Sequence, residues 1–164
     1  MIYKKVLFVG NDNVCRSPMA ETIFRSLYGD GEPEFEITSR GLIVLFEEPY
    51  NEKVEMILYN HGMETKEKVA LQLKPEDFGD DVLVLTMAFG DKLKIIEDYG
   101  VSENVYTLKE FIGNDDELLD PYGEELDIYE ACYQDMYLAL EEVKRKLEQP
   151  DAPPQAEEHG LDSF

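Results

Sequence analysis

Cysteine, positive charge and long apolar runs are all scarce in this sequence of 164 residues. The two cysteines, Cys15 and Cys132, lie in unrelated segments and lack the spacing of a metal site. No segment has the length and composition of a membrane-spanning helix, and the N-terminus does not resemble a secretory signal peptide. From these absences we expect a soluble, cytoplasmic protein with no metal, no cofactor and no membrane partner.

Basic residues are far outnumbered by acidic ones. Lysine and arginine total 15 against 37 aspartates and glutamates, which gives a formal net charge of −22. Such an excess of negative charge repels nucleic acid and anionic membranes, so cationic or neutral partners are the better expectation. The simplest interpretation of the charge is solubility rather than the steering of a partner.

The pattern of apolar residues predicts strands that alternate with helices. The strands are expected near residues 6–9, 35–41, 82–85 and 105–107, and the helices near 17–28, 50–60, 89–99 and 124–148, with a helical turn at 75–78. This alternation is typical of an α/β protein with a parallel sheet and helices on both faces. On two of the helices, His61 is expected to pack at a helix end and Cys132 to be a small core residue.

The composition changes near the C-terminus. Proline, alanine, glutamate and glycine dominate the residues that follow Gln149. We therefore expect one domain over residues 1–149 and a flexible tail over residues 150–164.

Residues 6–21, Val-Leu-Phe-Val-Gly-Asn-Asp-Asn-Val-Cys-Arg-Ser-Pro-Met-Ala-Glu, are the most informative stretch. An apolar run suited to a buried strand leads into a polar loop, and Arg16, Ser17 and Pro18 then open a helix. A loop between a strand and a helix N-terminus collects backbone N–H groups around an anion, and the helix dipole adds positive potential. Arg16 adds a two-pronged cation suited to phosphate, so the stretch predicts an oxyanion site.

This stretch resembles the phosphate-binding loop of the low-molecular-weight protein tyrosine phosphatases. That family usually carries Cys-x-Gly-Asn-x-Cys-Arg-Ser-Pro-Met-Ala-Glu, and Asn13 to Glu21 align with it without a gap. The resemblance extends over about residues 4–147 and is strongest to Gram-positive members. It implies a three-layer α/β sandwich with a four-stranded parallel sheet in the order 2-1-3-4, and a site at the carboxyl end of the first strand. It also implies phosphate or a phosphorylated protein as the ligand.

The resemblance assigns roles to residues of three segments. Asp120, in an Asp-Pro-Tyr-Gly turn, takes the place of the general acid, and Tyr122 takes the place of the aromatic residue at the substrate rim. Ser39, together with Asn13 and Ser17, takes the place of the residues that orient the loop by hydrogen bonds. The phosphate-binding residues are Asn11, Asp12, Asn13, Val14, Cys15, Arg16 and Ser17, of which Asn13 and Ser17 also orient the loop.

Two loop residues depart from the family pattern. Gly10 stands where the family has its nucleophilic cysteine, and Asp12 stands where it has glycine. Gly10 offers no attacking atom, and Asp12 adds a negative charge where a phosphate dianion should bind, which weakens binding. Asp tolerates a left-handed backbone, so the shape of the loop can survive the exchange.

Three interpretations of these departures stay open. The chain is a catalytically impaired relative that binds phosphate or phosphorylated protein, or it is an active phosphatase of phosphotyrosine or phosphoarginine that uses Cys15, Asp12 or a water as the nucleophile. The third is a scaffold with no ligand, which Arg16 disfavours because an unused loop has no need of a desolvated guanidinium. Asn11 matches neither residue common at the position linked to the choice of substrate, so the sequence does not select between phosphotyrosine and phosphoarginine.

Overall fold

A computed structural model describes residues 2–29, 31 and 33–149. The segment predicted to be a flexible tail, residues 150–164, lies outside the described residues. No helix in the described part of the chain is long and apolar enough to cross a membrane.

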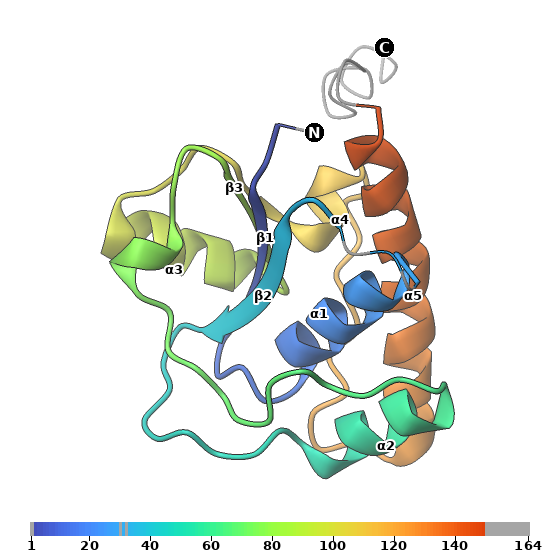
Figure 1. Cartoon of the computed structure of the whole chain (residues 1–164). Coiled ribbons are helices and arrows are strands. Elements are labelled where there is room, and N and C mark those ends of the chain that lie inside the picture. Colours follow the sequence, from blue (N-terminus) through green and yellow to red (C-terminus); the bar gives the residue numbers. More distant parts are fainter. Residues whose placement is uncertain (1, 30, 32, 150–164) are drawn as a thin grey trace.

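Four parallel strands form the central sheet (Figure 1). They are β1 (Lys5–Gly10), β2 (Glu36–Gly41), β3 (Val82–Thr86) and β4 (Val105–Thr107), and their order across the sheet is β2-β1-β3-β4. The predicted strand order and the predicted positions of all four strands are confirmed. Because the strands are parallel, their carboxyl ends share one edge of the sheet, and open α/β sheets bind ligands at such an edge.

Helices cover both faces of the sheet, which completes the three predicted layers (Figure 1). Helix α3 (Phe89–Tyr99) lies on one side. The other side carries α1 (Arg16–Ser26), α2 (Glu52–Asn60), the short α4 (Leu108–Phe111) and the long α5 (Leu126–Leu147). A 3-10 turn, η1 (Pro75–Asp77), occupies the position predicted for a helical turn.

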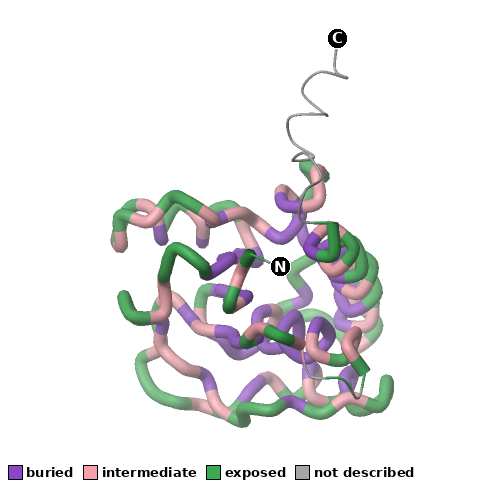
Figure 2. The backbone as a smooth tube through the Cα atoms, turned by 45° about the horizontal axis from the view of Figure 1, so that its top comes forward, coloured by how far each residue is buried: buried purple, intermediate pink, exposed green. Residues whose placement is uncertain are grey.

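Strand β1 lies at the centre of the core, where Val6 to Val9 are fully buried. Figure 2 shows that the buried stretches of the chain lie mainly in the interior and the exposed ones at the periphery. Val6 and Phe8 face the apolar cluster beneath α1 and α5, whereas Leu7 and Val9 face the smaller cluster beneath α3. All four side chains are fully buried, because successive residues of a strand point to opposite faces and both faces are covered.

Some local expectations need correction. Helix α1, predicted over 17–28, spans Arg16–Ser26 and is buried continuously from Ser17 to Phe24, because it lies between the sheet and α5. Helix α4 was not predicted, because four residues are too few to show helical periodicity in the sequence. A capping box marks its start: the side chains of Thr107 and Glu110 each accept the backbone N–H of the other residue. Helix α2 begins only at Glu52, because the side chain of Asn51 caps it.

Candidate functional site

The loop between β1 and α1 lies at the carboxyl edge of the sheet. Neighbouring segments hold its carbonyl groups: the N–H of Leu42 donates to Gly10, that of Ile43 to Asn11, and that of Asn51 to Val14, at 2.8–3.0 Å. The N–H of Val14 donates to the carboxylate of Asp12 at 3.2 Å. The remaining N–H groups of the loop and helix start donate to no group in the described part of the chain; they belong to Asn11, Asp12, Asn13, Cys15, Arg16 and Ser17.

The N-terminus of α1 carries no side-chain cap. Its N-cap residue is Cys15, whose side chain accepts no hydrogen bond from the first turn, whereas Asn51 caps α2 through two backbone N–H groups. The first N–H groups of a helix have no partner within it, and an anion supplies what a capping side chain otherwise would. The uncapped start of α1 therefore suits an oxyanion.

Asn13 fixes the shape of the loop. Its backbone is left-handed, with φ of 61°, a conformation that asparagine adopts more readily than most residues. The Nδ2 group donates to the hydroxyls of Ser17 and Ser39, both at 3.0 Å, and Oδ1 accepts the N–H of Leu71 at 2.9 Å. The buried Asn13 side chain thus ties the loop to α1, to β2 and to the segment that follows α2.

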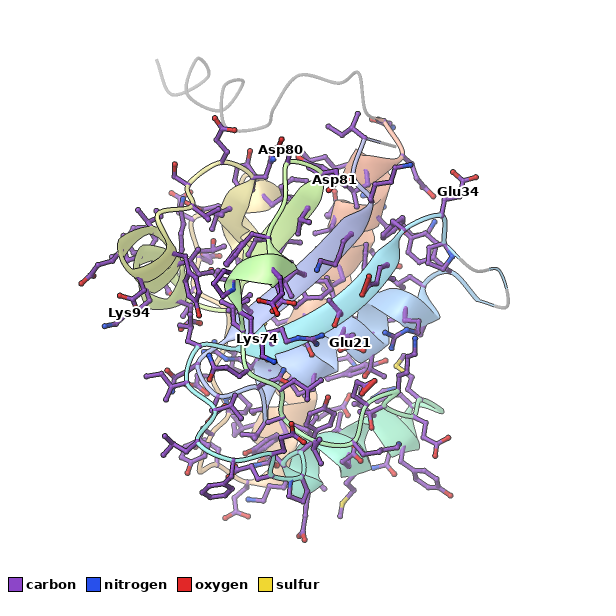
Figure 3. The ribbon with its side chains drawn as sticks, turned by 60° about the vertical axis from the view of Figure 1, so that its left-hand side comes forward. Glu21, Glu34, Lys74, Asp80, Asp81 and Lys94 are labelled. Carbon is purple, nitrogen blue, oxygen red and sulfur yellow. The ribbon has the colours of Figure 1, made fainter. Side chains whose placement is uncertain are left out.

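A buried carboxylate determines which groups of this network donate and which accept hydrogen bonds. Glu21 lies between α1 and β2 (Figure 3), where it pairs with Arg25 at 2.6 Å and accepts the hydroxyl proton of Ser39 at 2.7 Å. The hydroxyl oxygen of Ser39 therefore accepts a hydrogen bond from Asn13, and so does that of Ser17. Because Ser17 is an acceptor here, its own hydroxyl proton stays available for donation.

The loop borders a cavity of about 250 Å³. This volume lies below the roughly 300–1,000 Å³ of pockets that enclose drug-sized ligands, so it fits a small group carried by a larger molecule. The lining residues come from the loop, from the end of β3 and from the segment before α5; they are Gly10, Asn11, Asp12, Cys15, Arg16, Ser17, Met87, Asp120 and Tyr122.

Arg16 points inward rather than to solvent, with 15% of its side chain exposed. Its Nη1 donates to the carbonyl of Leu118 at 3.1 Å, and its Nη2 lies 3.8 Å from the carboxylate of Asp120, which is itself 60% exposed. The guanidinium is therefore held at the cavity and joins the loop to the segment that carries Asp120.

Gly10 closes the cavity at the end of β1. A side-chain carbon on this glycine would lie 3.0 Å from Oγ of Ser17 and 3.6 Å from a carbon of Met87. The backbone at Gly10 does not have the positive φ that would exclude a side chain. A larger residue therefore fits if the Ser17 hydroxyl shifts by a few tenths of an ångström.

Cys15 supplies a thiol at the cavity, and this residue is 8% exposed. Burial, followed by the negative charge of Asp120, raises the pKa of the Cys15 thiol to about 12, and the nearby Arg16 only partly opposes this. The thiol is thus protonated at neutral pH, whereas the thiolate is the nucleophilic form.

Asp91 is a further acid beside the site, on the first turn of α3. Burial raises its pKa to about 6, although Arg16 and the N–H of Ala88 act in the opposite direction. The charges of Asp12 and Asp120 also contribute to the increase, which places Asp91 within electrostatic reach of the cavity.

The comparisons with known proteins are consistent with this geometry. The family model described as "Low molecular weight phosphotyrosine protein phosphatase" matches residues 5–151. A relative named low molecular weight protein-tyrosine-phosphatase PtpB, from Staphylococcus epidermidis, is 36% identical over 145 residues, which cover 88% of this chain and 99% of the relative.

The chain belongs to the low-molecular-weight protein tyrosine phosphatase family.

Solved structures of the family share the fold. A low molecular weight protein tyrosine phosphatase from T. tengcongensis has a TM-score of 0.81 at 30% identity, over 87% of this chain and 98% of that one. The YwlE arginine phosphatase from Geobacillus stearothermophilus has a TM-score of 0.78 at 28% identity, over 90% of this chain and 94% of that one. A mutant of a YwlE arginine phosphatase was solved with a phosphorylated active-site serine.

Most residues that the phosphatase resemblance selected lie at one site. Eight of the nine lining residues are among them, including Asp120 and Tyr122 from the distant turn. Asn13, Val14 and Ser39 lie behind the cavity wall instead, buried among hydrogen bonds or apolar side chains. His61 stacks on Tyr133 at a helix end, and Cys132 is fully buried, as predicted for both, although His61 lies outside the buried stripe of α2.

Several residues near this phosphatase-family site were not selected from the sequence. Met87 directly follows β3, and its place at the carboxyl edge of the sheet is the signal that could have identified it. Glu21 was noted only as part of the motif, and its role in the network appears only when α1 packs on β2. Asp91 and the Leu118 carbonyl carry no local signal, because each meets Arg16 through the tertiary fold.

Proposed function

We propose that this chain is a catalytically impaired member of the family that binds phosphate or phosphorylated protein ligands at residues 10–16. The observation that carries the proposal is that Gly10, which stands at the family's nucleophile position, lines a cavity that keeps its oxyanion-binding groups. Arg16 and the uncapped N–H groups of the α1 start supply those groups.

Because residue 10 has no attacking atom, we expect the site to bind a phosphoryl group without hydrolysing its ester. Hydrolysis through a covalent intermediate needs a nucleophile in line with the leaving oxygen, and glycine supplies none. The phosphorylated active-site serine in the YwlE mutant is an example from a relative of a side-chain atom accepting the phosphoryl group. An in-line displacement tolerates little misplacement, since about 1 Å can cost roughly a hundredfold.

Cys15 is a weak substitute for the missing cysteine. Its thiol is buried, and the raised pKa of about 12 keeps it protonated. A nucleophilic cysteine has the opposite property, a pKa lowered by nearby positive charge. These features support the impaired form over an active phosphatase that uses Cys15.

Calorimetric titration of the full chain with inorganic phosphate tests the binding half of the proposal. We expect saturable binding to the parent chain and a loss of at least about tenfold in affinity in Arg16→Ala, because a charge-assisted contact is removed. Lys94→Ala is the matched control, since it removes a positive charge from the exposed surface of α3 (Figure 3), and it should bind like the parent. Equal or undetectable binding by the parent and Arg16→Ala refutes the proposed site.

Hydrolysis of an aryl phosphate tests the second claim of the proposal, that the chain is catalytically impaired. We expect the parent and Cys15→Ser to show the same background rate. Turnover by the parent that disappears in Cys15→Ser shows that the second cysteine has replaced the first, and it refutes the impaired form.

A further inference from the structure

We infer that this site selects singly charged oxyanion esters, such as sulfate monoesters and phosphodiesters, over the doubly charged phosphate monoesters. The inference rests on the proposed function, because it concerns which oxyanion the same loop accepts. It follows from the balance of charge around the cavity.

The cavity is lined by one cation and two anions. Arg16 carries the positive charge, and Asp12 and Asp120 carry the negative charges, so the lining has a formal charge of −1 at neutral pH. The charge of Arg16 is already paired with Asp120 at 3.8 Å. The carboxylate of Asp12, in addition, accepts the N–H of Val14, which ties this negative charge to the loop.

The charges are close enough to act together. Arg16, Asp12 and Asp120 each shift the pKa of Cys15, and the same three shift that of Asp91. A second negative charge on a ligand is therefore repelled by two carboxylates and attracted by only one guanidinium among the lining residues. A repulsion of two unit charges roughly 4 Å apart costs about fivefold in affinity even with the screening of bulk water.

The neutral donors of the site can bind a singly charged ligand as well as a doubly charged one. The N–H groups at the start of α1 and the hydroxyl of Ser17 can donate to the oxygens of a monoanion. A monoanion thus keeps the hydrogen bonds and avoids much of the repulsion. The N–H and hydroxyl donors therefore recognise the oxygens of the ligand, whereas the two carboxylates disfavour a second negative charge on it.

Other titratable groups around the site must be considered in a pH experiment. Tyr129, with a raised pKa, and both cysteines, with pKa values of about 12, stay protonated across the acidic and neutral range. Asp91, on α3, loses its charge as the pH falls below about 6. Its protonation strengthens the binding of every anion, so a ligand whose own charge is constant is needed as a reference.

The test compares phenyl phosphate, phenyl sulfate and methyl phenyl phosphate by calorimetry on the full chain at constant ionic strength. At pH 7.5 the first is mostly a dianion, whereas the sulfate and the diester are monoanions. We expect each monoanion to bind at least about fivefold more tightly than phenyl phosphate. At pH 5.5 phenyl phosphate becomes mostly a monoanion, since such groups have a second pKa near 6. Its affinity relative to phenyl sulfate should then rise to within about twofold.

Two variants locate the effect. Asp12→Asn should raise the affinity for phenyl phosphate at pH 7.5 by about fivefold and that for phenyl sulfate by less. Asp80→Asn removes a carboxylate beside the start of β3, at the opposite edge of the sheet (Figure 3), and should leave the ratio of affinities unchanged.

The outcomes distinguish this inference from the proposed function. Tighter binding of phenyl phosphate than of both monoanions at pH 7.5, dependent on Arg16, overturns the charge selection and leaves the proposed function standing. If phenyl sulfate binds more tightly than phenyl phosphate and the bulkier diester does not, the selection by charge is supported and the size of the ester excludes the diester; if phenyl sulfate does not bind more tightly, the selection by charge is overturned. Binding of none of the three refutes both.

Discussion

Nη2 of Arg16 lies 3.8 Å from the carboxylate of Asp120. The same guanidinium must contact a bound oxyanion, so Asp120 competes with the ligand for it. Asp120→Asn should therefore raise the affinity for inorganic phosphate by about two- to fivefold, a modest effect because an exposed ion pair is screened by solvent. Calorimetry at low salt measures this, and the gain should shrink at high salt. A loss of affinity instead means that Asp120 helps to bind phosphate.

Asn13 should be the most important single residue for the stability of the loop. Asn13→Ala leaves the N–H of Leu71 and two hydroxyls without their partner and places alanine in a left-handed conformation. We expect a loss of about 2–3 kcal/mol in the free energy of unfolding, measured with urea. Asn104→Ala is the matched control, because Asn104 has the same φ of 61° but weaker hydrogen bonds. Its loss should be about 1 kcal/mol. Equal losses would mean that the backbone conformation alone matters.

The stability of the fold should depend on pH through Asp91. Its pKa rises from 3.8 in a model compound to about 6 in the folded chain, so between these values the folded state binds more protons than the unfolded state. Stability conferred by this group is therefore present in full below pH 4 and falls as the pH rises through 6.

Asp91→Asn tests this dependence. The amide keeps an acceptor for the N–H of Ala88 and carries no charge, so the variant should gain about 1–2 kcal/mol at pH 7, allowing for partial solvent screening. The gain should vanish near pH 4. Urea unfolding across this range measures it, and a gain that does not change with pH points to a cause other than ionisation.

Both cysteines should resist alkylation in the folded protein. Burial raises the pKa of Cys15 and of Cys132 to about 12, so only about one thiol in ten thousand is ionised at pH 8. We expect iodoacetamide to label neither cysteine over hours in the folded chain and both within minutes in urea, as followed by mass spectrometry. Rapid labelling of Cys15 alone in the folded chain contradicts the neutral thiol on which the impaired form relies.

The fold follows closely from local patterns, whereas the electrostatics of the site do not. Val6 to Val9 are apolar because both faces of β1 are covered, so the run itself indicates a central strand. The motif from Asn13 to Glu21 likewise places the loop and Arg16. The contact of Arg16 with Leu118, by contrast, joins segments far apart in the chain, and no periodicity reports it.

The state of Cys15 shows why the site could be located but not characterised from the sequence. Its place in the motif predicts that it lies in the loop that binds the anion, and in the structure it lines the cavity beside Arg16. Its protonation depends on burial and on Asp120, and both arise only when the segment before α5 folds against the loop. The direction of the hydrogen bonds from Glu21 through Ser39 to Asn13 also requires the packing of α1 on β2.

The most direct test of the account is the restoration of activity at residue 10. Gly10→Cys places a side-chain carbon 3.0 Å from the Ser17 hydroxyl and attaches a sulfur to it, in a backbone conformation that accepts a side chain. Gly10→Ala adds the same first carbon without the sulfur and controls for its bulk. Hydrolysis of an aryl phosphate by the three chains is the measurement. The account predicts background rates for the parent and Gly10→Ala, and a rate at least about a thousandfold higher for Gly10→Cys. Equal turnover by the parent and Gly10→Cys, or no gain in a folded Gly10→Cys that still binds phosphate, contradicts it.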